Sequence, residues 1–287
     1  MLMEIFQSII NGLMFGFILI TISLGISLIY GVMGIVNFAH GEFLMIGMYI
    51  VYWMWRLYGW DPYLSMIVSV PILVLIGVLI QKHIIKPVLK APHYSQIALT
   101  LALSIIMQNV ALILWTGTPR AVVVPYASQV IELGGFLFSF PAVVASIVSL
   151  SLIVLLFFFL TKTDAGTALR AASQDIDAAE LTGIDTEYVY VLAFALSMIL
   201  VGVASSLLAP IYGVYPQTGT YFCLLAFVVV VLGGLEIKGT LIGGLIIGLT
   251  ESLAGFLYNP GYKEIITFII FMILLLLKPK GLMGEKT

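Results

Sequence analysis

The 287-residue chain is 62% apolar and only 9% charged, and its formal net charge is −2. A soluble domain carries roughly 25% charged residues, so this composition excludes an ordinary soluble protein and indicates a membrane protein. The nearly balanced charge gives no reason to expect a nucleic-acid partner. The single cysteine, Cys223, cannot form a disulfide within the chain and suits a small apolar position in a helix.

Long apolar runs follow one another along the chain, and roughly 20 such residues span a bilayer. Because backbone polar groups in lipid must bond to one another, the runs predict an all-α polytopic protein with one transmembrane domain over residues 1–287. The start of the chain lacks a basic segment and cleavage site, so the first run is expected to be retained. We expect nine crossings, with eight as the alternative, at about residues 5–30, 38–55, 63–80, 97–115, 141–160, 188–209, 220–234, 241–258 and 264–277.

Basic residues predict the orientation of these crossings, because Lys and Arg gather on the cytoplasmic side. With nine crossings, three basic residues fall on one side of the membrane: Arg56, Arg120 and Lys263. The other nine fall on the opposite side: Lys82, Lys86, Lys90, Lys162, Arg170, Lys238, Lys278, Lys280 and Lys286. The second side is therefore expected to be cytoplasmic, which places the N-terminus outside and the C-terminus inside.

The densest polar segment at membrane depth runs from Gly31 to Glu42 and contains Asn37 and His40. Polar residues inside a membrane are costly, so these three are candidates for a translocation pathway lined by a broken helix. The alternative is a structural turn in which Asn37 caps the next helix and Glu42 places negative charge in its first turn. One His and one Glu are too few ligands to predict a metal site.

A second glycine-rich segment, 232–251, ends in Glu251. Its small residues form a stripe that allows two helix backbones to approach closely, so they are assigned to helix packing: Gly239, Gly243, Gly244 and Gly248. Glu251 has no basic neighbour in sequence and is a further pathway candidate, facing the bundle interior or water. The two Gly-interrupted segments occupy corresponding places in the two halves, as an internal repeat would require.

Two loops stand out between the apolar runs. The outer loop of about residues 116–140 is interpreted as a segment that folds back on the membrane, a docking site for an external partner or a plain connector. The segment from Thr163 to Asp185 predicts a polar helix capped by Asp164 and closed by Gly183 in the left-handed conformation. Ala172 and Ala179 lie on its small, apolar face, which suits docking to a soluble partner. The alternative is that the segment is only a solvated connector.

Several motifs are missing from the sequence. It contains no G-x-x-x-x-G-K-[ST], no G-x-S-x-G and no H-E-x-x-H. A P-loop nucleotide site is therefore excluded, and an enzyme is not expected.

Five segments together carry a resemblance to a known family: Ile9 to Gly16, Leu28 to Glu42, Leu169 to Asp185, Gly233 to Glu251 and the closing Lys278 to Gly284. In this order they resemble the LivH-type permeases of branched-chain amino-acid ABC importers. Permeases for urea and short amides belong to the same family. Glu236 and Lys238 depart from the small turn expected in the family.

The resemblance implies a prokaryotic cell-membrane importer with five parts. These are this chain, a second LivM-like permease, two ATP-binding subunits that hold ATP and Mg, and an extracytoplasmic binding protein. No cofactor is expected on this chain. Residues 164–183 would be the cytoplasmic coupling helix that meets the ATPase, through Arg170, Ala171, Ala172, Asp175, Ala178, Ala179, Glu180 and Gly183.

The sequence is compatible with three functions. The first is import of branched-chain or other hydrophobic amino acids, for which Glu251 or Glu42 would balance the substrate ammonium group. The second is import of urea or short amides by a permease of the same family. The third, from a different class, is a self-sufficient secondary transporter that uses His40, Glu42 and Glu251 as ion sites, with a channel or membrane scaffold as a further alternative.

Overall fold

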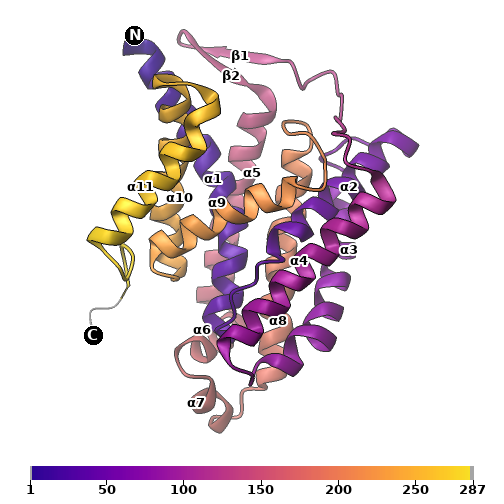
Figure 1. Cartoon of the computed structure of the whole chain (residues 1–287), viewed down its shortest axis with the longest axis vertical. Coiled ribbons are helices and arrows are strands. Elements are labelled where there is room, and N and C mark those ends of the chain that lie inside the picture. Colours follow the sequence, from indigo (N-terminus) through magenta and orange to yellow (C-terminus); the bar gives the residue numbers. More distant parts are fainter. Residues whose placement is uncertain (1, 285–287) are drawn as a thin grey trace.

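The computed structural model describes residues 2–284 and consists almost entirely of helices (Figure 1). Lys286 lies outside the described residues. The expected apolar runs correspond to α1 (Leu2–Met33), α2 (His40–Tyr58), α3 (Met66–Ile80), α4 (His93–Trp115), α5 (Phe140–Lys162), α8 (Thr186–Leu208), α9 (Thr218–Gly233), α10 (Ile237–Leu257) and α11 (Lys263–Leu277). A π-helical stretch, Gln81–Ile85, and a short turn, Lys86–Val88, extend α3.

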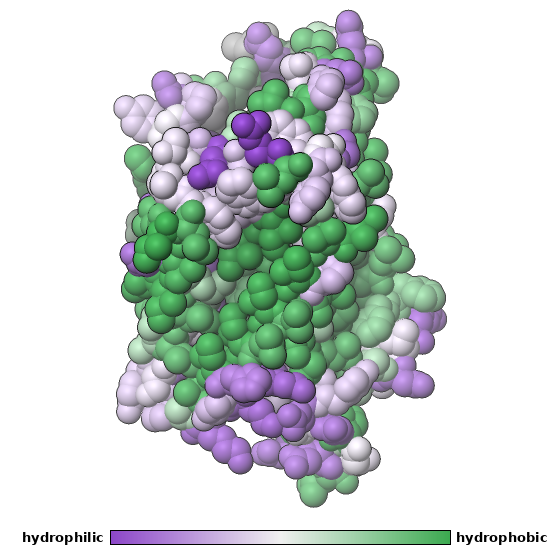
Figure 2. All heavy atoms as spheres, turned by 90° about the vertical axis from the view of Figure 1, so that its right-hand side faces the viewer, coloured by the Kyte–Doolittle hydropathy of each residue, from purple (hydrophilic) through white to green (hydrophobic). Residues whose placement is uncertain are grey.

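The described residues include seven helices that are long and apolar enough to cross a bilayer. The all-α polytopic class is therefore confirmed. The shorter α9 and the more polar α2, which carries His40, Glu42 and Arg56, are not among the seven. Figure 2 shows a broad apolar band between two polar ends, and most exposed large apolar side chains come from α3, α4, α5 and α11.

Two helices, α1 and α8, form the centre of the bundle. Most residues of both are buried, and they pack on each other, while α11 lies almost wholly on the surface. At one end of the molecule α1 contacts the short helix α6 (Asp164–Gln174), which packs on α7 (Ile176–Leu181). Its start lies at the other end, beside the hairpin of β1 (Val130–Leu133) and β2 (Phe136–Ser139) (Figure 1).

The chain is interrupted twice inside the bundle. Residues 34–39 connect α1 to α2, and residues 209–217 connect α8 to α9, with buried positions in both connections. α1 packs on α9 and α10 as α8 packs on α2 and α3. Because α1 and α8 run in opposite directions, the helices α1–α3 and α8–α10 make corresponding contacts in opposite orientations, which is the arrangement that inverted repeats have.

In this arrangement the break before α2 corresponds to the segment before α9, whereas in the sequence the glycine-rich stretch 232–251 occupies the corresponding place. The glycines of that stretch, which the sequence assigns to helix packing, lie at helix contacts. An added Cβ at Gly239 or Gly243 would meet α9, and one at Gly244 or Gly248 would meet α1.

The loop between α4 and α5 folds back on the bundle. Arg120 forms an antiparallel bridge with Val214, in the segment before α9, with N···O distances of 3.0 and 2.8 Å. Its guanidinium donates to the Trp115 carbonyl oxygen at 2.7 Å and lies over the rings of Tyr52 and Trp53. The loop is therefore packed on the bundle through Arg120.

The crossing of α2 and α9 leaves no room for a side chain at Gly41. An added Cβ there would meet the Gly219 carbonyl oxygen, and one at Gly219 would lie 2.5 Å from the Gly41 carbonyl oxygen. We predict that Gly41→Ala lowers the stability of the purified protein by about 1–3 kcal/mol, because the crossing must open. Thermal unfolding in detergent measures this loss. Gly31→Ala is the matched control, since its Cβ would meet only Ser173 Cβ at 3.8 Å; an equal loss in both variants would contradict the prediction.

Candidate functional site

The first polar cluster lies where α2 begins and holds a fully buried Glu42. Its Oε1 accepts hydrogen bonds from Ser104 Oγ at 3.0 Å, Gln108 Nε2 at 2.8 Å and Thr220 Oγ1 at 3.2 Å. Gln108 Nε2 also donates to Thr220 Oγ1 at 2.6 Å. One carboxylate oxygen therefore ties α2 to α4 and α9, and such networks are strong in a low-dielectric interior. Glu42 Oε2 has no hydrogen-bond partner among the described residues.

The other two polar residues of this segment bond to backbone. Asn37 Oδ1 accepts from the Ala39 amide at 3.1 Å, so it closes the turn before α2; the cap position itself is Ala39, which has no side-chain bond. The expected Asn37 cap is therefore wrong by two residues. His40 is buried and its Nε2 donates to the Ile22 carbonyl oxygen of α1 at 3.1 Å. Both side chains thus secure the break between α1 and α2.

A second polar group lies apart from the first and contains Glu251, which is 3% exposed. Its Oε2 lies 3.3 Å from Lys263 Nζ, and its Oε1 accepts from Thr267 Oγ1 at 2.9 Å. Sequence reasoning missed Lys263 as a partner because that residue belongs to the next helix, across the turn after α10. The structure therefore divides the four predicted pathway residues into two groups, with Asn37, His40 and Glu42 in one and Glu251 in the other.

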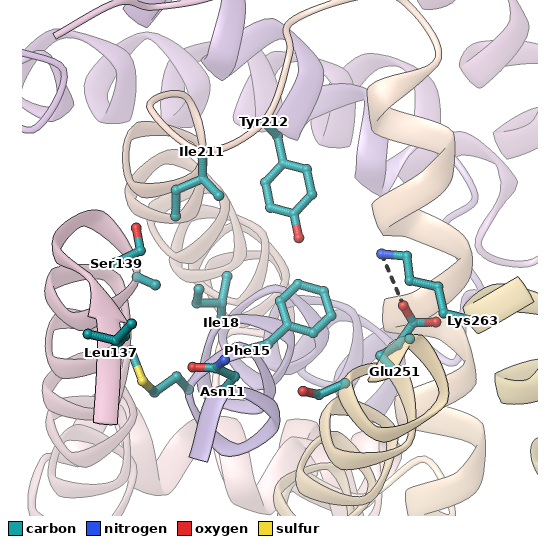
Figure 3. A pocket seen from close by; sticks show the side chains of 13 residues that line it. Asn11, Phe15, Ile18, Leu137, Ser139, Ile211, Tyr212, Glu251 and Lys263 are labelled. Atoms are coloured by element: carbon teal, nitrogen blue, oxygen red, sulfur yellow. Dashed lines mark ion pairs between the residues drawn. The ribbon is translucent and has the colours of Figure 1, made fainter. Parts of the chain in front are cut away.

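Glu251 and Lys263 line a cavity of about 390 Å³ near the hairpin end of the bundle (Figure 3). Its walls come from α1, β2, the start of α5, residues 211–212, α10 and α11. Figure 3 shows the ion pair on one side and Phe15, Ile18 and Ile211 nearby. A larger cavity of about 830 Å³ lies at the opposite end and includes Arg170 of α6 and both residues of the unusual turn, Glu236 and Lys238.

The polar segment after α5 forms two helices instead of the single helix expected over 164–183. Thr163, and not Asp164, is the cap of α6, where its Oγ1 accepts from the Gly166 amide at 3.0 Å. Asp175 interrupts the helix with extended backbone and caps α7 by accepting from the Ala178 amide at 3.0 Å. The side chain of Asp175 competes with helix continuation in this way. Gly183 has φ of 89°, so the expected left-handed conformation is present.

The exposed face of this segment also differs from the expected one. Ala172 and Ala179 are buried against the bundle, because the small face packs on the chain's own helices. Of the other residues assigned to coupling, Ala171 is half-buried and the rest are exposed: Arg170, Asp175, Ala178, Glu180 and Gly183. Leu181, at the tip of α7, is 90% exposed and was not predicted. A lone leucine after a polar helix was the signal available in the sequence.

A bundle of apolar helices, with two interrupted in its interior and charged groups on its cavities, has the architecture of a multi-pass membrane transport protein. Comparison with known proteins defines the class further. The chain belongs to the family described as the branched-chain amino acid transport system permease component, which matches residues 8–275. The chain is thus a membrane-embedded transport subunit, as the resemblance indicated.

Several relatives cover nearly the whole chain. The LivH permease protein of the high-affinity branched-chain amino acid transport system of Escherichia coli K12 is 30% identical over 97% of this chain and 95% of its own length. A probable LivH permease protein of Methanocaldococcus jannaschii is 32% identical over 96% and 91%. The BraD permease protein of Pseudomonas aeruginosa is 27% identical over 97% and 95%. No solved structure matches the chain.

The Glu42 cluster yields a prediction about stability. Glu42→Leu leaves Gln108, Ser104 and Thr220 without their shared acceptor, so we expect the free energy of unfolding to fall by at least about 2 kcal/mol. Glu42→Gln keeps an acceptor oxygen, so its free energy of unfolding is expected to fall less. Thermal unfolding of the purified protein measures both, with Glu132→Leu on the exposed hairpin as the control. Equal unfolding temperatures for Glu42→Leu and the control would contradict the role of the cluster.

Proposed function

We propose that this chain is one of two permease subunits of an ATP-driven importer for branched-chain amino acids. The observation that carries the proposal is the family match over residues 8–275, together with relatives whose names state this transport system. The remaining parts would be a second permease, two ATP-binding subunits and an extracytoplasmic binding protein. ATP and Mg would belong to the ATP-binding subunits, since the sequence has no P-loop.

The orientation proposed is that expected from the basic residues, with α6 and α7 in the cytoplasm. Support comes from the ends of the bundle. Lys86 forms an ion pair of 2.8 Å with Glu187 at the start of α8, next to α7. Arg120 lies toward the end of the bundle that carries the hairpin. The N-terminus and hairpin would then be external, and α11 would bring the chain back to the cytoplasm after nine passes.

Cysteine labelling tests this topology. We expect Glu132→Cys in the hairpin to react with a membrane-impermeant maleimide added to intact cells. Lys90→Cys, in the exposed turn before α4, should react only after the membrane is opened. The native Cys223 is buried and serves as the background. Labelling of Lys90→Cys in intact cells would overturn the orientation and, with it, the assignment of α6 and α7 to ATPase docking.

The docking surface for the ATPase is proposed to be the exposed tip of α7, rather than the buried small face. Leu181 projects there among polar neighbours, including Asp177, Glu180 and Thr182. A few side chains in well-packed, desolvated pockets carry most of the binding energy of an interface, and Leu181 is the large apolar side chain that this tip offers for such a pocket. The polar residues around it keep the tip soluble before assembly.

Replacement of this side chain tests the coupling role. We predict that Leu181→Asp reduces ATP-driven leucine uptake by reconstituted vesicles at least about tenfold, because the hot-spot contact is lost. Leu133→Asp is the matched control, since Leu133 is also exposed but lies on the hairpin at the opposite end. Unchanged uptake by Leu181→Asp would remove α7 from the coupling interface.

The alternatives give different results in the same vesicles. A secondary transporter would accumulate leucine from a proton or sodium gradient without ATP-binding subunits, and a channel would equilibrate it without either energy source. A urea or short-amide permease would show ATP-driven uptake of those solutes and none of leucine. The proposed function requires uptake of leucine that depends on both ATP and the ATP-binding subunits.

A further inference from the structure

The cavity at the hairpin end combines an apolar wall with one charged corner. Met14, Phe15 and Ile18 of α1 contribute apolar surface, together with Ile211. Glu251 and Lys263 form the charged corner (Figure 3). The cavity volume of about 390 Å³ falls within the range of about 300–1,000 Å³ that is usual for small-molecule sites. A ligand that fits this surface has an aliphatic part and two opposite charges close together.

The two charged side chains are held from behind by separate partners. Thr267 Oγ1 donates to Glu251 Oε1 at 2.9 Å, while Lys263 Nζ donates to the Tyr221 hydroxyl at 3.1 Å and lies 5.6 Å from the centre of that ring. Only Glu251 Oε2 and Lys263 Nζ face each other, at 3.3 Å. Each side chain of the pair is therefore held by a partner of its own as well as by the ion pair.

Stability alone is a poor explanation for this ion pair. Burying a carboxylate costs several kcal/mol, and apolar side chains of similar size usually stabilise an interior as well or better. Here the carboxylate is buried, but the lysine side chain is 28% exposed and both groups border the cavity. Charged groups held beside a cavity of a membrane protein are candidates for binding a polar ligand.

We propose that this cavity is an amino-acid binding site within the permease itself, an inference that rests on the proposed function. The Glu251 carboxylate would accept the α-ammonium group, and Lys263 would donate to the α-carboxylate. The aliphatic side chain would lie against Phe15, Ile18 and Ile211. When a zwitterion binds, the Glu251–Lys263 ion pair is replaced by two ion pairs with the ligand, and the net charge of the site does not change. Binding therefore requires no proton uptake.

Direct binding tests the site in the whole complex. The permease pair with its ATP-binding subunits, in nanodiscs and without the binding protein, is titrated with radiolabelled leucine. We expect saturable binding that Glu251→Gln and Lys263→Met each weaken at least tenfold. Glu264→Gln is the matched control, because it removes an exposed carboxylate beside Lys263 and should leave binding unchanged. Wild-type affinity in both Glu251→Gln and Lys263→Met would overturn the proposal.

Ligand analogues assign the two contacts without relying on stable variants. Leucine methyl ester lacks the carboxylate charge, and 4-methylpentanoate lacks the ammonium group. Both should compete at least tenfold more weakly than leucine with the wild-type complex. Lys263→Met should weaken leucine but leave competition by the ester unchanged, while competition equal to that of leucine by either analogue would refute the zwitterion contacts.

A charge exchange separates ligand binding from a purely structural pair. The double variant Glu251→Lys, Lys263→Glu restores the ion pair, so the complex should assemble, yet leucine uptake should remain at least tenfold below wild type. Full recovery of uptake would show that the pair is structural. If the wild type shows normal ATP-driven uptake and the variants show the same uptake, only the binding site is refuted and the proposed function stands. Absence of ATP-driven leucine uptake by the wild type would refute the proposed function instead.

Discussion

The constraint on which the structure depends is that backbone groups inside a membrane must find partners within the protein. At both breaks in the bundle, residues outside the break provide hydrogen-bond partners for the interrupted backbone. At the first, Thr100 Oγ1 of α4 donates to the Val36 carbonyl oxygen at 3.1 Å, and Asn37 closes the turn. At the second, Thr218 Oγ1 donates to the Gly213 carbonyl oxygen at 3.0 Å, while Arg120 pairs with Val214. The interior breaks therefore require the packing around them.

The same packing explains why small residues and one carboxylate meet at the crossing of α2 and α9. Backbone contact at Gly41 and Gly219 brings the first turns of both helices together. Glu42 and Thr220 each follow one of these glycines, and their hydrogen bond joins the two repeats. The loop containing Arg120 pairs with the segment immediately before α9, so the loop and this crossing are joined through a short stretch of backbone.

The sequence predicts the helical class and the apolar runs because lipid imposes a length and a composition on each crossing. It does not predict which glycines mark a break. The glycines in 232–251, which the sequence assigns to helix packing, lie at close helix contacts, while the second break, at 209–217, contains only one glycine, Gly213. That break depends on Arg120, about 90 residues earlier in the chain, and such a distant partner leaves no local pattern.

The site residues show the same limit. Glu42 and Glu251 were identified because a charge at membrane depth is unusual, whereas their partners Gln108 and Lys263 are ordinary residues on other helices. Residues 164–183, proposed as the coupling segment, were identified by their polarity and by Gly183 at their end. Its orientation was wrong because an apolar stripe has the same spacing whether it meets a partner or the chain's own core. For Ala172 and Ala179 that core is already present in this chain.

The two cavities share three helices, since α1, α5 and α10 contribute to both. Between the cavities, every residue of α1 from Ile18 to Ile29 is buried. The part of α1 that joins the two cavities is therefore enclosed by the chain's own helices. α10 packs closely along it: Gly248 approaches the backbone of α1 at Gly12 and Gly16, and the Ile20 side chain lies over Gly244. α6 packs against the far end of α1. The helix that borders both cavities therefore also contacts the segment proposed to dock on the ATPase.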